Sequence, residues 1–349
     1  MDVTFPISQG LFRRFSPLRR VAVVTLGALA TFCLEPAPSQ AQDLGVQRVA
    51  TSSGTFLKIG LDARGAALGG SYNALVEGAA AAFYNPAGVA VGPNDGELFV
   101  SYVAWPAEIR LGAVSVTRNV PQFGGRVAFA LAFLGTDLDE TTEFRPFGTG
   151  RTVNYSDVLG TLSFSRLFTD RLSIGVSAKL FYEDLASNVG GSQTTGLLFD
   201  AGTNYELGYR NSRLAITLSH FGPDLQPDGR YESAVTNADV EYTSYSPPTL
   251  FNLGFAIDPW ESGPHRLTVS GQVVHPADQN ETLLTGAEYW FSDRYAVRTG
   301  YDFASEEFGF SAGFGVRLRM AGREGKIDYA FTEGGHLAAI HRWGVGFQL

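Results

Sequence analysis

The chain has 349 residues and a formal net charge of −9, and only 17% of its residues are charged. Binding to nucleic acid requires clustered lysines and arginines, and this acidic sequence shows no such cluster, so nucleic acid is excluded as a partner. Its 41 glycines, 26 phenylalanines and 14 tyrosines favour an all-β chain in which small and aromatic residues alternate.

Residues 1–41 have the pattern of a cleaved secretory signal peptide. Four arginines precede the apolar run 21–34, and Ala41 ends a small-x-small cleavage pattern. The run is shorter than the roughly twenty residues that a membrane-spanning helix needs. The segment carries a net charge of +2, so the remainder carries −11. It also contains the single cysteine, Cys33, and Phe32 before it disfavours a lipoprotein signal. We therefore expect no disulfide, no metal site and no cofactor in the mature chain.

Residues 42–96 are too short and too rich in glycine to form a domain of their own. Glycine permits positive φ angles and close backbone approach, which suits a chain folded tightly inside another structure. We predict that this segment is a plug, or hatch, within a barrel lumen.

Residues 97–349 alternate apolar and polar side chains in segments of about ten residues, which is typical of a transmembrane β-barrel. Between 171 and 182, Leu172 and Val176 fall on one face and Ser173 and Lys179 on the other. The segment 307–318 alternates in the same way, with Phe308 on the apolar face, and 294–304 repeats the pattern. A soluble β-sandwich is the alternative, but aromatic residues at strand ends suit the girdles of a membrane barrel.

We expect about fourteen antiparallel strands. Their ranges are 97–104, 108–117, 124–134, 155–167, 171–182, 195–207, 212–220, 249–258, 264–274, 281–291, 294–304, 307–318, 324–333 and 338–349. Connections after even-numbered strands are short, and the long ones, at 135–154, 183–194 and 221–248, follow odd-numbered strands. This places both ends of the barrel on the periplasmic side. The last strand ends at the chain terminus with an apolar, aromatic pattern that resembles the signal read by outer-membrane assembly machinery.

Three runs in the plug carry a family resemblance. They are Phe56-Leu57-Lys58-Ile59-Gly60, Ala63 to Tyr72, and Ala81 to Gly88, which contains Asn85-Pro86-Ala87-Gly88. Together they resemble the start of mature PorV/PorQ family proteins, within the wider group similar to the FadL fatty-acid transporters. Leu68 and Tyr84 depart from the family, which usually has Met and Trp there. The resemblance implies a fourteen-stranded outer-membrane barrel with an N-terminal hatch.

The resemblance also implies two roles. In the first, the barrel acts in type IX secretion and surface attachment, binding exported protein through its extracellular loops. In the second, it carries hydrophobic small molecules across the outer membrane, as FadL does. Outer-membrane lipid is a partner in both.

Charged residues are expected on the inner face of the barrel, where opposite charges on neighbouring strands can pair and anchor the plug. A polar ligand site is the alternative. These residues are Arg126, Lys179, Asp200, Glu288, Arg298, Asp302, Arg317 and Asp328.

In the plug, Arg64 is expected to bind lumen carboxylates, and Asn85 before Pro86 is expected to be extended and to fix a turn. Structural anchoring and a gating role both remain open. The plug residues singled out are Phe56, Leu57, Arg64, Gly69, Gly70, Asn85, Pro86, Ala87 and Gly88.

The long loops mix aromatic and acidic residues, and aromatic residues are favoured at protein interfaces. They form either a partner-binding surface or solvated loops. The aromatic candidates are Phe144, Phe147, Tyr231, Tyr242 and Tyr245. No catalytic motif accompanies the five histidines, so we predict no enzymatic activity.

Overall fold

The computed structural model describes residue 52 and residues 54–92, 96–232, 238–305, 308–320 and 322–349. The predicted signal peptide, residues 1–41, and the first part of the predicted plug lie outside the described residues. None of the described helices is long and apolar enough to cross a membrane.

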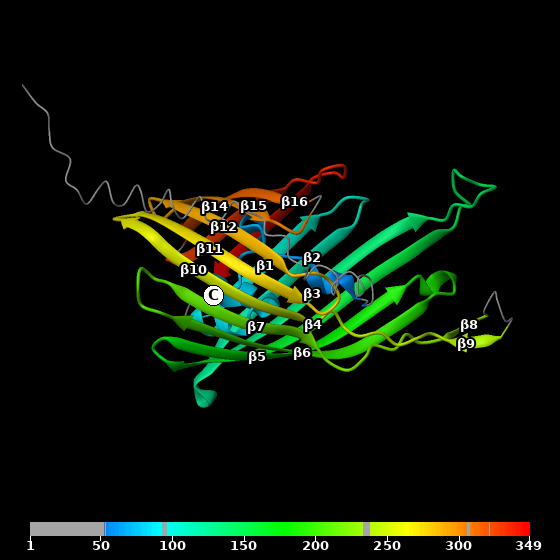
Figure 1. Ribbon diagram of the computed structural model, residues 1–349, viewed down its shortest axis with the longest axis horizontal. Helices are drawn as coiled ribbons and strands as arrows, with labels where there is room; N and C mark the ends of the chain where they lie inside the picture. Colours follow the sequence, from blue (N-terminus) through cyan, green and yellow to red (C-terminus); the bar gives the residue numbers. More distant parts are fainter. Residues whose placement is uncertain (1–51, 53, 93–95, 233–237, 306–307, 321) are drawn as a thin grey trace, which may run out of the picture. The chain divides into compact units, whose positions relative to one another are not determined.

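Fourteen of the described strands form one closed antiparallel barrel (Figure 1). The last strand pairs with both its predecessor and the first strand, for example at Trp343 opposite Tyr102, and so closes the sheet. The barrel strands are β1 (Glu97–Ala104), β2 (Arg110–Val120), β3 (Gly125–Asp139), β4 (Thr152–Thr169), β5 (Leu172–Leu185), β6 (Ser192–Glu206), β7 (Arg213–Phe221), β10 (Leu250–Ser262), β11 (His265–Pro276), β12 (Thr282–Phe291), β13 (Tyr295–Asp302), β14 (Phe310–Met320), β15 (Arg323–Thr332) and β16 (Ile340–Gln348).

The barrel predicted from the sequence is confirmed, with differences at strand ends. β3, β4, β5 and β6 extend beyond their predicted ends on the side of the long loops, where their ladders continue past the predicted ranges. The long connection 222–249 is not wholly irregular, because it contains a hairpin of β8 (Arg230–Glu232) and β9 (Asp239–Glu241). We call the barrel ends the long-loop end and the short-turn end; Glu97 and Gln348 both lie at the short-turn end.

The two faces of the strands follow the predicted alternation. On β5, Ser173, Ser177 and Lys179 are buried inside, whereas Val176 and Leu180 are exposed outside. Phe308 is an exception to the prediction: it packs against Trp105, with ring centroids 5.6 Å apart, in an interior cluster. The reason is that β14 begins only at Phe310, so Phe308 belongs to a loop that turns inward.

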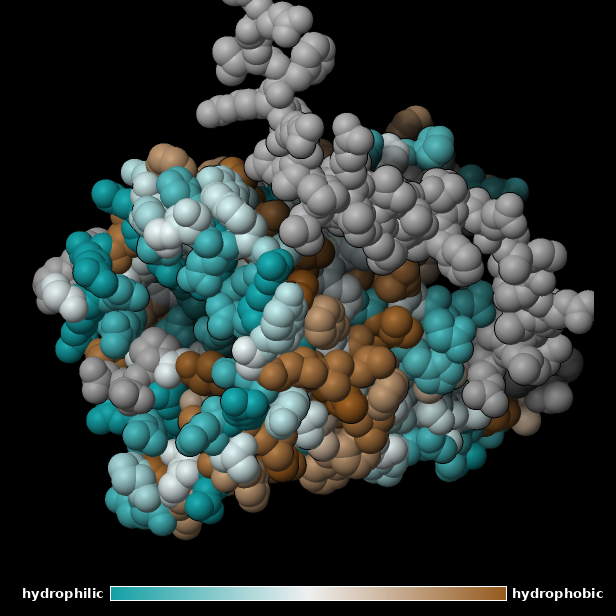
Figure 2. Space-filling view, turned by 60° about the vertical axis from the view of Figure 1, so that its left-hand side comes forward, coloured by the Kyte–Doolittle hydropathy of each residue, from teal (hydrophilic) through white to brown (hydrophobic). Residues whose placement is uncertain are grey.

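The outward face of the barrel is apolar and matches a lipid environment. Large hydrophobic side chains on almost every barrel strand are exposed there, among them Phe133, Leu162 and Val297. Figure 2 shows apolar side chains gathered in one continuous area that hydrophilic side chains border on both sides.

Residues 54–92, which we call the lumen segment, lie inside the barrel. The segment contains the short helices η2 (Thr55–Lys58), α3 (Ala63–Ala67), η3 (Gly78–Phe83) and η4 (Pro86–Val91). α3 contacts β13 to β16, η3 contacts β1 to β4, and η4 contacts β3 to β6, so the segment touches opposite parts of the inner wall (Figure 1).

Glycines on the inner wall allow this close contact. A Cβ atom on Gly300 would lie 2.0 Å from the Leu68 carbonyl carbon, and one on Gly175 would lie 2.3 Å from the Pro86 carbonyl carbon. Within the lumen segment, Gly69 has a φ of +63° and lies against the backbone of Tyr301. The small-residue pattern of the wall and the lumen segment is therefore a packing requirement.

A side chain at one of these glycines should loosen the lumen segment. We expect Gly300→Ala to lower the free energy of unfolding by about 1–3 kcal/mol, as overpacking does. Thermal unfolding of the purified barrel, followed by heat-dependent mobility on a gel, measures this. Gly271→Ala is the matched control, because a Cβ there meets nothing within 4 Å; equal stability of both variants would contradict the packing argument.

Candidate functional site: an apolar cavity in the lumen

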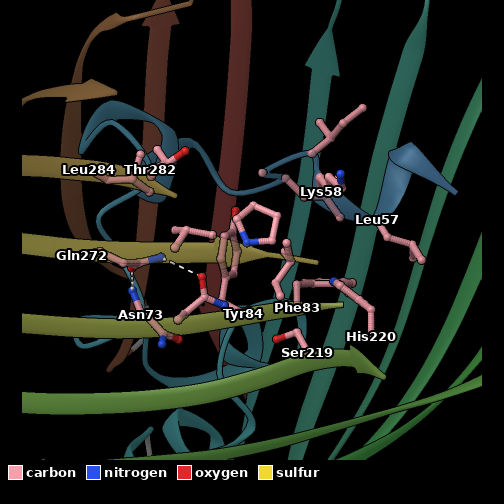
Figure 3. A pocket seen from close by; sticks show the side chains of 18 of the residues that line it. Leu57, Lys58, Asn73, Phe83, Tyr84, Ser219, His220, Gln272, Thr282 and Leu284 are labelled. Atoms are coloured by element: carbon pink, nitrogen blue, oxygen red, sulfur yellow. Dashed lines mark hydrogen bonds between the residues drawn. The ribbon is translucent and has the colours of Figure 1, made fainter. Parts of the chain in front are cut away.

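A cavity of about 320 Å³ lies between the lumen segment and the wall of β7 and β10 to β13. Figure 3 shows Leu57 and Lys58 on one side of it and Thr282 and Leu284 on the other. Half of its side chains are apolar: Phe56, Leu57, Ile59, Leu61, Phe83, Leu159, Leu250, Val274, Pro276 and Leu284. The other half carry polar or charged groups: Lys58, Asn73, Tyr84, Ser219, His220, Asn252, Gln272, Gln279, Thr282 and Asp302.

A second cavity of about 440 Å³ shares Phe56 and Ile59 with the first. Its remaining lining is Thr55, Trp105, Ile109, Leu134 and Tyr155. η2 therefore lies between two cavities. The apolar residues of the second cavity and those of the first on the η2 side belong to one interior cluster, which does not include Leu250, Val274, Pro276 or Leu284. Arg342 connects the chain after η2 to the second cavity. Its Nε donates to the Gly60 carbonyl over 3.0 Å, and its guanidinium lies 5.7 Å from the centre of the Trp105 ring.

Hydrogen bonds to amide side chains attach the lumen segment to the barrel wall beside the first cavity. The backbone N–H groups of Tyr72 and Asn73 donate to Gln272 Oε1 over 3.2 and 3.0 Å, and Gln272 Nε2 donates to Asn252 Oδ1 over 3.3 Å (Figure 3). Gln272 thus links the lumen segment to the wall while its side chain also lines the cavity.

A buried charged group lies behind Leu57. Lys179 Nζ is 2.5 Å from Asp200 Oδ2 and 3.2 Å from His220 Nδ1, and the His220 N–H donates to Asp200 Oδ1 over 2.8 Å. His220 has a φ of +57° at a register shift between β6 and β7, which turns its side chain into the lumen. The alternation of side chains predicts inward positions for Lys179 and Asp200 but not for His220, because strict alternation does not predict a bulge.

Four of the predicted residues form an ion network between the lumen segment and the wall. Arg64 donates to both Glu288 oxygens over 2.9 Å. Arg298 donates to Glu288 over 2.5 Å and to Asp328 over 2.7 Å. Glu288 and Arg298 are opposite each other on β12 and β13. The geometry is the one expected for anchoring.

Other predicted plug residues also make anchoring contacts. Asn85 is extended, with φ −142° and ψ 106°, and its Oδ1 accepts from the Ala87 N–H over 3.0 Å. Its Nδ2 donates to the carbonyls of Asn73 and Thr203, each over 3.2 Å. Pro86 and Ala87 lie against Gly175 on β5, and a Cβ on Gly88 would lie 2.3 Å from the Val76 carbonyl oxygen.

The remaining predicted lumen residues do not join one site. Arg126 is buried and lies beside Gly92. Asp302 lines the first cavity and accepts from the Ala304 N–H. Arg317 lies at the short-turn mouth, exposed, with its guanidinium 4.0 Å from the centre of the Trp290 ring.

The loop residues divide into two groups. Phe144 and Phe147 are fully exposed, and Tyr231 packs on Tyr242 with ring centroids 5.2 Å apart. Tyr245 departs from the expected loop surface: its hydroxyl donates to Glu183 over 3.0 Å, and its ring packs on the interior cluster.

An ion pair that sequence reasoning missed fastens the lumen segment at the long-loop end. Lys58 Nζ donates to Asp278 Oδ1 and Oδ2 over 2.7 and 2.6 Å, and Ser52 also donates to Asp278. Asp278 lies in the loop between β11 and β12, outside the strands. No sequence pattern relates residues so far apart.

Comparisons with known proteins concern the fold. No family model and no curated protein matches the chain. Among solved structures, it is similar to the CymD monoaromatic hydrocarbon channel, with a TM-score of 0.55 and 14% identity over 82% of this chain and 96% of that one. It is also similar to the Ralstonia pickettii toluene transporter TbuX, with a TM-score of 0.53 and 13% identity over 82% of this chain and 97% of that one. A Pseudomonas aeruginosa FadL homologue has a TM-score of 0.52 and 14% identity over 82% of this chain and 98% of that one.

The chain has the fold of these channels. The FadL-like part of the resemblance is thereby supported at the level of the fold, whereas PorV/PorQ membership is not confirmed.

Removing the shared carboxylate of the ion network should destabilise the barrel. Glu288→Gln leaves buried Arg298 and partly buried Arg64 without the carboxylate that they share. We therefore expect a loss of about 3–5 kcal/mol in the free energy of unfolding. Glu281→Gln is the control, since that side chain is 66% exposed and its loss should change stability by less than about 0.5 kcal/mol. Urea unfolding in detergent measures both; a stable E288Q barrel would contradict an anchoring role.

The Lys58–Asp278 ion pair should open in acid. Burial acts to raise the pKa of Asp278, but hydrogen bonds from Lys58 and Ser52 outweigh it and hold that pKa below its ordinary value of 3.8. A lowered pKa means that the ion pair stabilises the fold at higher pH and is lost as the pH falls through the lowered value. A spin label attached to Thr55→Cys should become more mobile as the pH falls through this lowered pKa. In a variant that also carries Asp278→Asn, the label should already be mobile at neutral pH. An immobile label in that background at neutral pH would refute the link.

Proposed function

We propose that this protein is an outer-membrane channel for hydrophobic small molecules. The observation that carries the proposal is the pair of cavities that meet at η2 at the long-loop end. Half of the side chains that line the first cavity are apolar, and nearly all of those that line the second are apolar or aromatic. Ligand pockets are mostly apolar, with a few placed polar groups. The apolar outer face supports a membrane location, and the expected signal peptide fits export to the outer membrane.

The cavities give the proposed ligand a place to bind next to η2, whose Phe56 and Leu57 pack in the apolar interior cluster. A molecule that enters from the long-loop end meets the second cavity at Trp105 and the first beyond η2. Passage between them requires η2 to shift, whereas Arg64 and Asn85 hold the remainder of the segment. The proposed gate is thus residues 54–61, held by the Lys58–Asp278 ion pair.

Two of the structurally similar proteins are a monoaromatic hydrocarbon channel and a toluene transporter, which agrees with this proposal. At 13–14% identity the similarity concerns the fold alone, so the ligand class is proposed from the cavity chemistry. We propose no enzymatic activity.

The secretion role implied by the PorV/PorQ resemblance is the second candidate. One observation favours it: Phe144 is 91% and Phe147 102% exposed on the connection between β3 and β4. Exposed aromatic side chains suit a protein interface. This candidate requires capture of an exported protein that Phe144→Ser with Phe147→Ser abolishes, and a type IX sorting-domain cargo in the same genome.

Filling the cavity should stop transport. We expect Leu284→Trp, which places an indole in the first cavity, to reduce uptake of radiolabelled toluene by expressing cells at least about 10-fold, because the ligand loses its space. Leu283→Trp is the matched control, since Leu283 faces outward, is 46% exposed, and tryptophan is favoured at membrane surfaces.

Folding of both variants is checked by heat-dependent gel mobility. Undiminished uptake through a folded L284W barrel, or equal loss in both variants, would overturn the channel proposal.

A further inference from the structure

Arginines gather on the outside of the barrel at its short-turn end. Arg118 and Arg166 lie near the ends of β2 and β4, and Arg171, Arg210 and Arg294 lie in the turns; all five are exposed. We call these five residues the arginine rim. Within the described part of the chain, none of them forms an ion pair with a carboxylate. At the long-loop end, Arg151 pairs with Glu140 and Arg230 with Asp239 and Glu241, whereas Arg110 and Arg145 form no ion pair among the described residues.

Three members of the arginine rim stack on exposed aromatic rings. The guanidinium carbon lies 5.7 Å from the centre of the Phe168 ring for Arg166, 5.5 Å from that of Tyr209 for Arg210, and 5.6 Å from that of Tyr295 for Arg294. The rings are 60%, 65% and 46% exposed. The other arginine–aromatic contacts among described residues lie in the lumen or its mouth, on Tyr72, Trp290 and Trp105.

The position of these pairs defines the chemistry around them. Exposed aromatic side chains at strand ends mark the boundary between hydrocarbon and headgroups. Among the described residues, the stacked Arg166 and Arg294 guanidiniums donate no hydrogen bond, whereas Arg210 donates one, from Nη1 to the Pro259 carbonyl over 2.8 Å. The N–H groups of a guanidinium match the geometry of a phosphate. The layer at this depth of a bilayer is the phosphate layer of the lipids.

Acidic residues also lie at the short-turn end, and among the described residues none of them forms an ion pair with the arginine rim. Asp170 and Asp293 lie in turns, Glu206 is the last residue of β6, and Glu261 is the last but one of β10. Glu324 pairs with Arg319 over 2.8 Å, outside the arginine rim. The Arg166 guanidinium lies beside Gly124 in the turn between β2 and β3.

We infer that the arginine rim binds the phosphate groups of anionic phospholipids in the leaflet at the short-turn end. Basic residues near an anionic membrane surface attract its lipids, and each arginine adds to that attraction. The bound lipid fixes the depth and orientation of the barrel in the membrane. This inference does not depend on what passes through the lumen.

Native mass spectrometry of the full barrel tests the inference. The protein is reconstituted with equal amounts of phosphatidylglycerol and phosphatidylcholine and extracted in mild detergent, and the ratio of the two retained lipids is measured. The rim variant Arg166→Gln, Arg210→Gln, Arg294→Gln should lose the preference for phosphatidylglycerol by about 10-fold, since three lipid contacts are removed.

The matched control removes three arginines at the other end, Arg145→Gln, Arg151→Gln, Arg230→Gln, and should keep the wild-type ratio. An unchanged ratio in the folded rim variant, or an equal loss in the control, overturns the inference. If the triple variant does not fold, Arg166→Gln against Arg151→Gln gives the same comparison, with a smaller loss expected in R166Q alone.

Discussion

The structure depends on one constraint: in hydrocarbon, each backbone N–H and C=O must find its partner within the protein. Closing fourteen strands through the β1–β16 pair meets it. Because side chains alternate along a strand, closure also fixes which residues face lipid and which face the lumen. The inner face then has to hold the lumen segment, and it does so with glycines where backbones meet and with charges where side chains meet.

The lumen has two environments. Beside α3, Arg64, Glu288, Arg298 and Asp328 satisfy one another, and such a network is costly to break once buried. Around η2, the contacts are mostly apolar, with the Lys58–Asp278 ion pair at the outer edge. Apolar contacts are non-directional, so an apolar ligand can replace them, whereas it cannot replace the ion network. This difference locates the proposed binding site and the proposed gate at the same end of the lumen segment.

The alternation of inward and outward side chains made the barrel strands, and many of the residues that face the lumen, predictable from the sequence. Period two and turn chemistry predicted all fourteen barrel strands, and the inward positions of Glu288 and Arg298 followed directly. What sequence reasoning missed depends on tertiary contacts. His220 enters the lumen through a bulge, Phe308 through a loop, and Tyr245 folds back onto Glu183. Lys58 and Asp278 are distant in the chain and meet only because the barrel brings them together.

The central claim is that apolar molecules bind within the lumen beside η2. Labelling of the folded barrel with a toluene-like photoreactive diazirine, mapped by peptide mass spectrometry, tests it most directly. The account predicts adducts on Phe56, Ile59, Trp105 and Leu284 that excess toluene suppresses. Adducts confined to lipid-facing side chains such as Phe133 and Val297, with no competition by toluene, would contradict it.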